Sequence, residues 1–131
     1  MLPKEHRLTS SRDHRDTMRQ GSRAGGGGVL VAVRIAPQRS AAETDPWRCG
    51  LVVSKAVGNA VVRHRVQRRL RHVIFDLMRD DALATPEGGQ LDMVIRAFPE
   101  IVDLDHAQLS AAVQGAAQRA LRKTALRRVQ Q

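Results

Sequence analysis

The sequence is poor in aromatic residues and in cysteine. Aromatic residues make up 2% of the 131 residues, and tyrosine is absent. Because many proteins that bind single-stranded RNA stack bases on aromatic rings, a chain of this composition must use mainly charge and shape for such a partner. The single cysteine, Cys49, excludes an internal disulfide. Its position in an apolar run predicts a buried side chain and not a reactive thiol.

Signals for membrane insertion and for catalysis by the protein are also missing. No apolar run is long enough to span a bilayer, and the N-terminal MLPKEHRLTS has no signal-peptide core, so we expect a cytoplasmic protein without membrane contact. The five histidines form neither HExxH nor a zinc-spaced cluster, and the glycine run lacks the Lys-Ser/Thr ending of a phosphate-binding loop. The neighbours Asp80 and Asp81 are better explained by a solvated loop than by acid–base catalysis.

Positive charge is what the sequence has in excess. The net charge is +9, and the isoelectric point is about 11.4. This balance predicts a polyanionic partner, either nucleic acid or an anionic membrane surface. The length suits one domain over residues 1–131, since two domains would each have too small a core.

The first predicted element is a helix between Ser10 and Gly21. Ser10 can cap its start, Asp13 stands where a capping box has an acid, and Gly21 can end it. His14 and Met18 are four residues apart and therefore share one face of this helix.

Further along, short apolar runs predict strands at 29–35, 47–54 and 91–97. The glycine-rich segment 21–28 predicts a flexible connector with room for another short strand, and 37–46 and 80–89 read as polar loops. A final helix begins near Asp105, where Gln108 completes a capping box, and it leads into a basic tail over 123–131. This order predicts an α+β fold in which helices pack on a small mixed sheet.

The segment KAVGNAVVRHRVQRRLRHV contains the densest charge. Arg63 to His72 holds five arginines and two histidines, and no acidic residue occurs from Pro46 to Phe75. Helical spacing places one apolar arc on Val62, Val66, Leu70, Val73, Ile74 and Leu77. The opposite arc carries His64, Arg65, Arg68, Arg69, Arg71 and His72. Exposed helices usually relieve such repulsion with glutamates at i,i+4 spacing, so this arrangement predicts a surface that a nucleic acid neutralises.

The charge pattern alone leaves three functions open: an RNA-bound enzyme subunit, a ribosomal or other binding protein, and a helix-based DNA regulator. A regulator should show helix-turn-helix spacing, whereas a strand and a glycine turn precede this basic helix. A ribosomal protein would stimulate no cleavage.

The same segment decides between these classes, because KAVGNAVVRHRVQRRLR resembles the signature of the protein subunit of bacterial ribonuclease P. Further matches are LPKEHRLTSSRD, GLVVSK, DMVIRA and LDHAQL, so the resemblance covers nearly the whole chain in family order. It implies an α-β-β-β-α-β-α order in a ribosomal protein S5 domain 2-like fold. The family's β-α-β crossover is left-handed, whereas general topology rules favour a right-handed one.

The resemblance also implies partners and a division of labour. In this family the partner is a large catalytic RNA that removes 5′ leaders from precursor tRNA, and the RNA performs the hydrolysis. The reaction uses Mg²⁺, bound mainly by the RNA and the substrate. No protein partner is implied.

Two sets of site residues are carried over from the family. The contacts to the catalytic RNA fall on Lys55, Arg63, His64, Arg65, Arg68, Arg69 and Arg71. Gly58, Asn59 and Ala60 match the turn that starts the helix. His64 stands where the family usually has asparagine and Gln67 where a basic residue is common; we expect Arg69 to supply the charge missing at Gln67.

The second set lies in a groove between the first helix and the sheet that holds the substrate leader. Family members commonly place aromatic residues where this chain has His14, Met18 and Ala32. Met18 could alternatively pack in the core. With stacking reduced, we expect basic residues near the groove to contact leader phosphates. The candidates are Lys4, Arg7 and Arg34.

Overall fold

The computed structural model describes residues 6–8, 10–36, 47–83 and 90–130. Lys4 and the predicted loop 37–46 lie outside the described residues, as does most of the predicted loop 80–89. None of the helices in the described part of the chain combines the length and the apolar character needed to cross a membrane.

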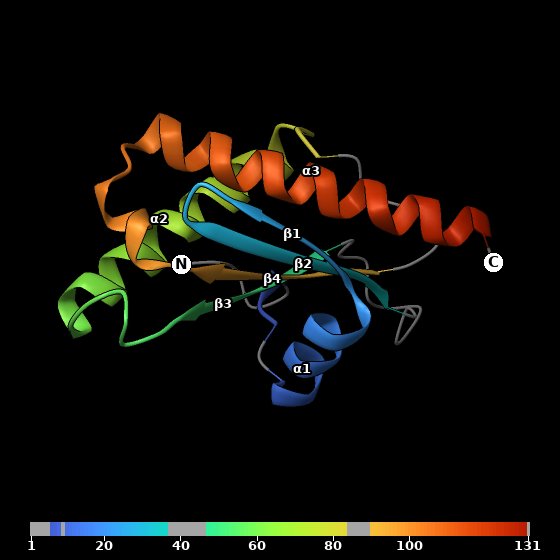
Figure 1. Cartoon of the computed structure of the whole chain (residues 1–131), viewed down its shortest axis with the longest axis horizontal. Helices are drawn as coiled ribbons and strands as arrows, with labels where there is room; N and C mark the ends of the chain where they lie inside the picture. Colours follow the sequence, from blue (N-terminus) through green and yellow to red (C-terminus); the bar gives the residue numbers. More distant parts are fainter. Residues whose placement is uncertain (1–5, 9, 37–46, 84–89, 131) are drawn as a thin grey trace.

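The elements follow the order α-β-β-β-α-β-α that the family resemblance implies (Figure 1). They are α1 (Ser11–Gln20), β1 (Ser22–Gly26), β2 (Val29–Ala36), β3 (Trp47–Val53), α2 (Ala60–Arg79), β4 (Gln90–Ala97), the short 3₁₀ helix η2 (Pro99–Asp103) and α3 (His106–Gln130). The sheet is mixed, with strand order β1-β2-β4-β3. Strands β3 and β4 are parallel neighbours joined through α2, whereas β2 is antiparallel to both β1 and β4.

The sheet separates two unequal layers of helices. Helices α2 and α3 cover one face, and α1 lies alone on the other (Figure 1). The predicted apolar arc of α2 is confirmed, because five of its six positions are buried in the core and Val62 packs at its edge. Asn59 caps this helix by accepting a hydrogen bond from the backbone N–H of Val62 at 3.0 Å. The arginine-bearing side of α2 therefore points away from the core.

The segment 21–28 differs from the predicted flexible connector. Residues 22–26 pair with β2 along their whole length, and a tight turn at Gly27 and Gly28 joins the two strands. These glycines have φ angles of +65° and +95°, which side chains other than glycine rarely adopt. The glycines are thus explained by a hairpin turn, and the additional strand is the one for which the sequence had room.

The C-terminal segment also differs from the prediction, because residues 123–130 continue helix α3. Two basic side chains of helix α3 form hydrogen bonds to the backbone of strand β1, at the edge of the sheet. Arg119 donates to the carbonyl of Gly25 at 3.1 Å, and Lys123 donates to the carbonyl of Arg23 at 2.7 Å. These bonds satisfy main-chain acceptors that an edge strand would otherwise leave unpaired. The predicted basic tail is therefore the end of helix α3, and this helix is hydrogen-bonded to strand β1.

Candidate RNA interface

The exposed side of α2 carries an uninterrupted row of arginines and histidines, here called the α2 ridge and defined as His64, Arg65, Arg68, Arg71 and His72. All of these are exposed except Arg71, which is half-buried. Among the described residues, none of the three ridge arginines forms an ion pair. The first carboxylate on the helix, Asp76, pairs with Arg79 at 3.2 Å. The ridge is therefore available to an anionic partner.

Three further residues of the predicted RNA-binding set are placed differently. Lys55 is exposed in the turn before α2. Arg63 is half-buried, and its Nε has no hydrogen-bond partner among the described residues. Arg69 donates from Nη2 to the carbonyl of Leu104, so it ties α2 to the connection that precedes α3. The geometry thus gives Arg69 a structural contact in addition to its charge.

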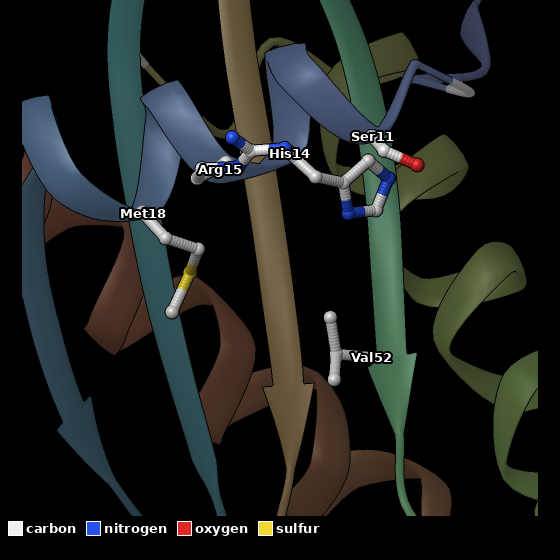
Figure 2. Close-up of a pocket in the computed structure, with 5 residues that line it drawn as sticks. All are labelled: Ser11, His14, Arg15, Met18 and Val52. Atoms are coloured by element: carbon white, nitrogen blue, oxygen red, sulfur yellow. The ribbon is translucent and has the colours of Figure 1, made fainter.

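On the opposite face of the sheet, α1 and β3 line an open pocket of about 400 Å³. Its lining comes from Ser11, His14, Arg15 and Met18 of α1 and from Val52 of β3 (Figure 2). Met18 and Val52 point into the open space over the sheet beside α1. His14 and Met18 are half-buried and line this pocket, and Met18 is not among the residues of the hydrophobic core.

His14 holds α1 against strand β3. A Cβ atom on Gly50 would lie 2.3 Å from the imidazole ring, so only glycine leaves room for the ring at this position. The ring also donates from Nε2 to the carbonyl of Leu8 at 2.6 Å, which attaches the segment before the helix. The position of this wall of the pocket therefore depends on the packing of the His14 ring against Gly50.

Beneath the other side of α1 lies a buried ion-pair network. Asp92 on β4 has no exposed surface and accepts two hydrogen bonds from Arg48, at 2.9 and 2.8 Å. Arg34 approaches the same carboxylate at 3.4 Å, and Arg48 also reaches Asp13 of α1 at 3.4 Å. Buried charges need such pairing, because an isolated carboxylate would lose its hydration without compensation. This network fixes α1 over β2, β3 and β4.

The remaining predicted groove residues within the described part of the chain differ in exposure and in their contacts. Ala32 has no exposed surface and therefore offers a leader no contact. Arg34 belongs to the ion-pair network, where it lies within 4 Å of three carboxylates, those of Asp13, Asp16 and Asp92. Arg7 is exposed and forms an isolated parallel bridge with Cys49.

Sequence reasoning missed several residues at the groove. Arg15 and Val52 line the pocket, and Val52 lies directly opposite Arg96 in the parallel β3–β4 pair. Arg96 is exposed and lies over the ring of Phe98, with 5.7 Å from its guanidinium carbon to the ring centroid. Arg96 and Asp92 are four residues apart on β4 and therefore project from one face of the sheet, but only the sheet register shows which residues stand beside them.

The cysteine and the carboxylates near the groove are either buried or paired with arginines. Burial raises the pKa of the Cys49 thiol to about 12, which makes it a poor nucleophile. Within the described residues, no group of three His, Cys, Asp or Glu side chains could hold a metal ion. The three carboxylates nearest the groove, those of Asp13, Asp16 and Asp92, are paired with arginines.

Comparison with known proteins identifies the family. The Ribonuclease P family profile matches residues 2–121. This chain belongs to the ribonuclease P protein family. The ribonuclease P protein component of Streptomyces avermitilis is 44% identical over 124 residues, which cover 92% of this chain and 96% of that one. The corresponding protein of Corynebacterium diphtheriae is 42% identical over 124 residues, covering 94% and 99%.

Solved structures of ribonuclease P proteins share the fold. The Staphylococcus aureus RNase P protein matches with a TM-score of 0.67 and 20% identity, over 88% of this chain and 94% of that one. The Thermotoga maritima RNase P protein matches with a TM-score of 0.67 and 19% identity, over 86% and 96%. The α+β fold expected from the ribonuclease P signature is therefore confirmed.

Proposed function

We propose that this chain binds the RNA of ribonuclease P through the α2 ridge and the 5′ leader of precursor tRNA in the groove between α1 and β3. The observation that carries the proposal is the placement of these two surfaces. The ridge lies on the helix layer that covers one face of the sheet, and the pocket lies on the other face (Figure 1). One small protein can therefore contact two RNA segments at once.

The ridge supplies the affinity for the catalytic RNA. Arg65, Arg68 and Arg71 recur at helical spacing on a rigid element, so their guanidinium groups are held in a fixed row. Arginine suits this task, because its planar fork donates paired hydrogen bonds to phosphate oxygens. Lys55 and Arg63 extend the cationic surface towards the start of α2.

The groove supplies the preference for precursor over mature tRNA. Met18 and Val52 give it an apolar floor, and the exposed Arg15 places a cation at its wall. A leader that crosses this space meets apolar contacts for its bases and a positive charge for its phosphates. Mature tRNA has no leader and cannot make these contacts.

Hydrolysis itself is assigned to the RNA subunit. The donor set of the described protein residues does not fit a divalent metal, because the acidic side chains nearest the groove are neutralised by Arg34 and Arg48. The proposal therefore derives no step through a protein-bound ion. Mg²⁺ is assigned to phosphates of the catalytic RNA and the substrate, which are its usual ligands.

Reconstitution tests this proposal. Purified protein is added to a bacterial ribonuclease P RNA and precursor tRNA at low Mg²⁺, and release of the 5′ leader is followed with time. We expect strong stimulation by the protein and no cleavage by protein that has been freed of RNA. Cleavage by RNA-free protein would overturn the division of labour, and a compatible RNA that gains nothing would overturn the assignment.

A matched pair of variants connects the activity to the ridge. Arg68→Ala removes a ridge cation that has no ion-pair partner among the described residues, whereas Arg79→Ala removes a cation of the same helix that is paired with Asp76 and Asp80. We expect the first change to raise the protein concentration needed for half-maximal stimulation and the second to leave it nearly unchanged.

A further inference from the structure

The face of the sheet that carries α1 is organised in successive rows of residues. In paired strands, residues that lie opposite each other project from the same face. Along β4 the first such row is the buried ion pair at Asp92, and the second is Val94 opposite Gly50, where His14 is seated. The third row is Arg96 opposite Val52, at the pocket.

This face continues past the end of β4. The backbone N–H of Phe98 donates to the carbonyl of Gly28 at 2.9 Å, so the pairing with the start of β2 extends to this residue. Because successive residues alternate between faces, Phe98 projects on the same face as Arg96, about 7 Å further along the chain. The side chain of Phe98 is not covered by the hairpin, and 37% of the residue remains exposed.

The two side chains are also in mutual contact. The guanidinium of Arg96 lies over the Phe98 ring, in the geometry of a cation–π interaction. Such a contact favours the two planar groups lying together before any ligand binds. Exposed arginine planes and aromatic rings are the groups on which single-stranded RNA bases stack.

We propose that Arg96 and Phe98 form a stacking platform for a leader base beyond the α1 pocket, which makes them specificity-determining residues for precursor tRNA. This inference rests on the proposed leader groove and extends it along β4. Few aromatic residues are present in the sequence. The His14 ring packs against Gly50, and Met18 has no ring, so neither residue provides an aromatic face for stacking. The platform places the missing stacking contact on the sheet instead of on the first helix.

The experiment measures binding of the reconstituted holoenzyme to a series of precursor tRNAs that differ only in leader length, beginning with mature tRNA. For Phe98→Ala we expect binding weaker by about fivefold or more, because one stacked base contributes that much. The loss should appear only when the leader is long enough to reach the platform. Arg96→Lys, which keeps the charge but loses the plane, should show the same onset with leader length. Phe98→Trp keeps an aromatic ring, so its affinity for long-leader precursor tRNA should equal or exceed that of the natural protein.

The control is Phe75→Ala, because Phe75 is also 37% exposed but lies on α2, away from the groove. Its effect, if any, should be equal at every leader length. If Phe98→Ala does not fold, Phe98→Leu removes the aromatic plane while keeping an apolar side chain, and the same loss is expected.

The possible outcomes separate the two proposals. A natural holoenzyme that binds mature and precursor tRNA equally would overturn the leader groove itself. A natural holoenzyme that prefers long leaders, with Phe98→Ala or Phe98→Leu keeping the full preference, would overturn the platform and leave the groove standing. A loss that is equal for mature tRNA would also overturn the platform.

Discussion

The imidazole of His14 occupies the space that a side chain on Gly50 would fill. An added Cβ atom at Gly50 would lie 2.3 Å from the ring, far inside van der Waals contact. The ring at the same time binds the carbonyl of Leu8 at 2.6 Å. One residue of α1 therefore positions the helix against β3 and sets one wall of the groove.

The close approach predicts the effect of Gly50→Ala. The methyl group must displace the His14 ring, and overpacking of this kind costs about 1–3 kcal/mol of folding free energy. The double variant Gly50→Ala, His14→Ala removes the clash, so it should lose less stability than the two single changes added together. Urea denaturation of all four proteins measures this coupling, and strict additivity would show that the two residues do not touch.

The buried carboxylate of Asp92 gives a second stability prediction. Arg48→Ala removes its bidentate partner and leaves Arg34, at 3.4 Å, as the remaining ion-pair partner within the described part of the chain. Breaking a buried pair in this way costs about 3 kcal/mol or more, because the remaining charge is poorly compensated. The matched control is Arg12→Ala, whose pair with Asp16 is long, at 3.9 Å, and solvent-exposed on the arginine side. Its free energy of unfolding should change by less than about 1 kcal/mol.

Local sequence signals predicted most of the fold. The helix cap at Ser10 and the capping box at Asp105 are confirmed by hydrogen bonds, because capping depends only on residues within one helical turn. Strand β1 was not recognised from composition, since its glycines resemble a linker. It forms because β2 supplies hydrogen-bond partners across a tight turn and α3 binds its outer edge, and the α3 contact comes from residues distant in sequence.

The groove was harder to predict, because it depends on register between strands. The alternation of residues along 29–35 places Ala32 and Arg34 on the face opposite the valines, but whether α1 covers them is not encoded locally. Ala32 is enclosed, and Arg34 is engaged by carboxylates from α1 and β4. Val52 and Arg96 become neighbours only because the crossover through α2 makes β3 and β4 parallel partners.

The α2 ridge predicts a defined salt dependence for binding to ribonuclease P RNA. Each phosphate contact releases condensed counterions, so the logarithm of the binding constant falls linearly with the logarithm of the salt concentration. Arg65→Ala and Arg68→Ala should each weaken binding and reduce this slope by roughly one unit. Arg79→Ala on the same helix should keep both affinity and slope. Unchanged values in both ridge variants would place the RNA site elsewhere.

Burial of Cys49 predicts an inert thiol. Desolvation raises its pKa from 9.0 to about 12, so near pH 8 almost no thiolate exists in the folded protein. A disulfide reagent should therefore modify Cys49 quickly in denaturant and very slowly in buffer. Because the unfolded thiol ionises first, stability present below pH 9.0 should decline as pH rises towards 12. Cys49→Ala should lack this particular decline, and fast labelling of the native protein would contradict the buried position.

The groove itself predicts that an aromatic ring at position 18 improves leader binding. Met18 points into the pocket from α1, whereas His14 is fixed by Gly50 and Leu8, so Met18→Phe is the less disruptive of the two aromatic replacements (Figure 2). One additional stacked base is worth roughly 1–3 kcal/mol. Reconstituted Met18→Phe holoenzyme should therefore bind leader-bearing precursor tRNA more tightly than the natural protein does. The gain should change little with salt, because stacking releases few counterions, unlike phosphate contacts. Mature tRNA provides the control, since it has no leader to stack. An equal gain on mature tRNA, or none on precursor tRNA, would show that the ring at position 18 does not face the leader.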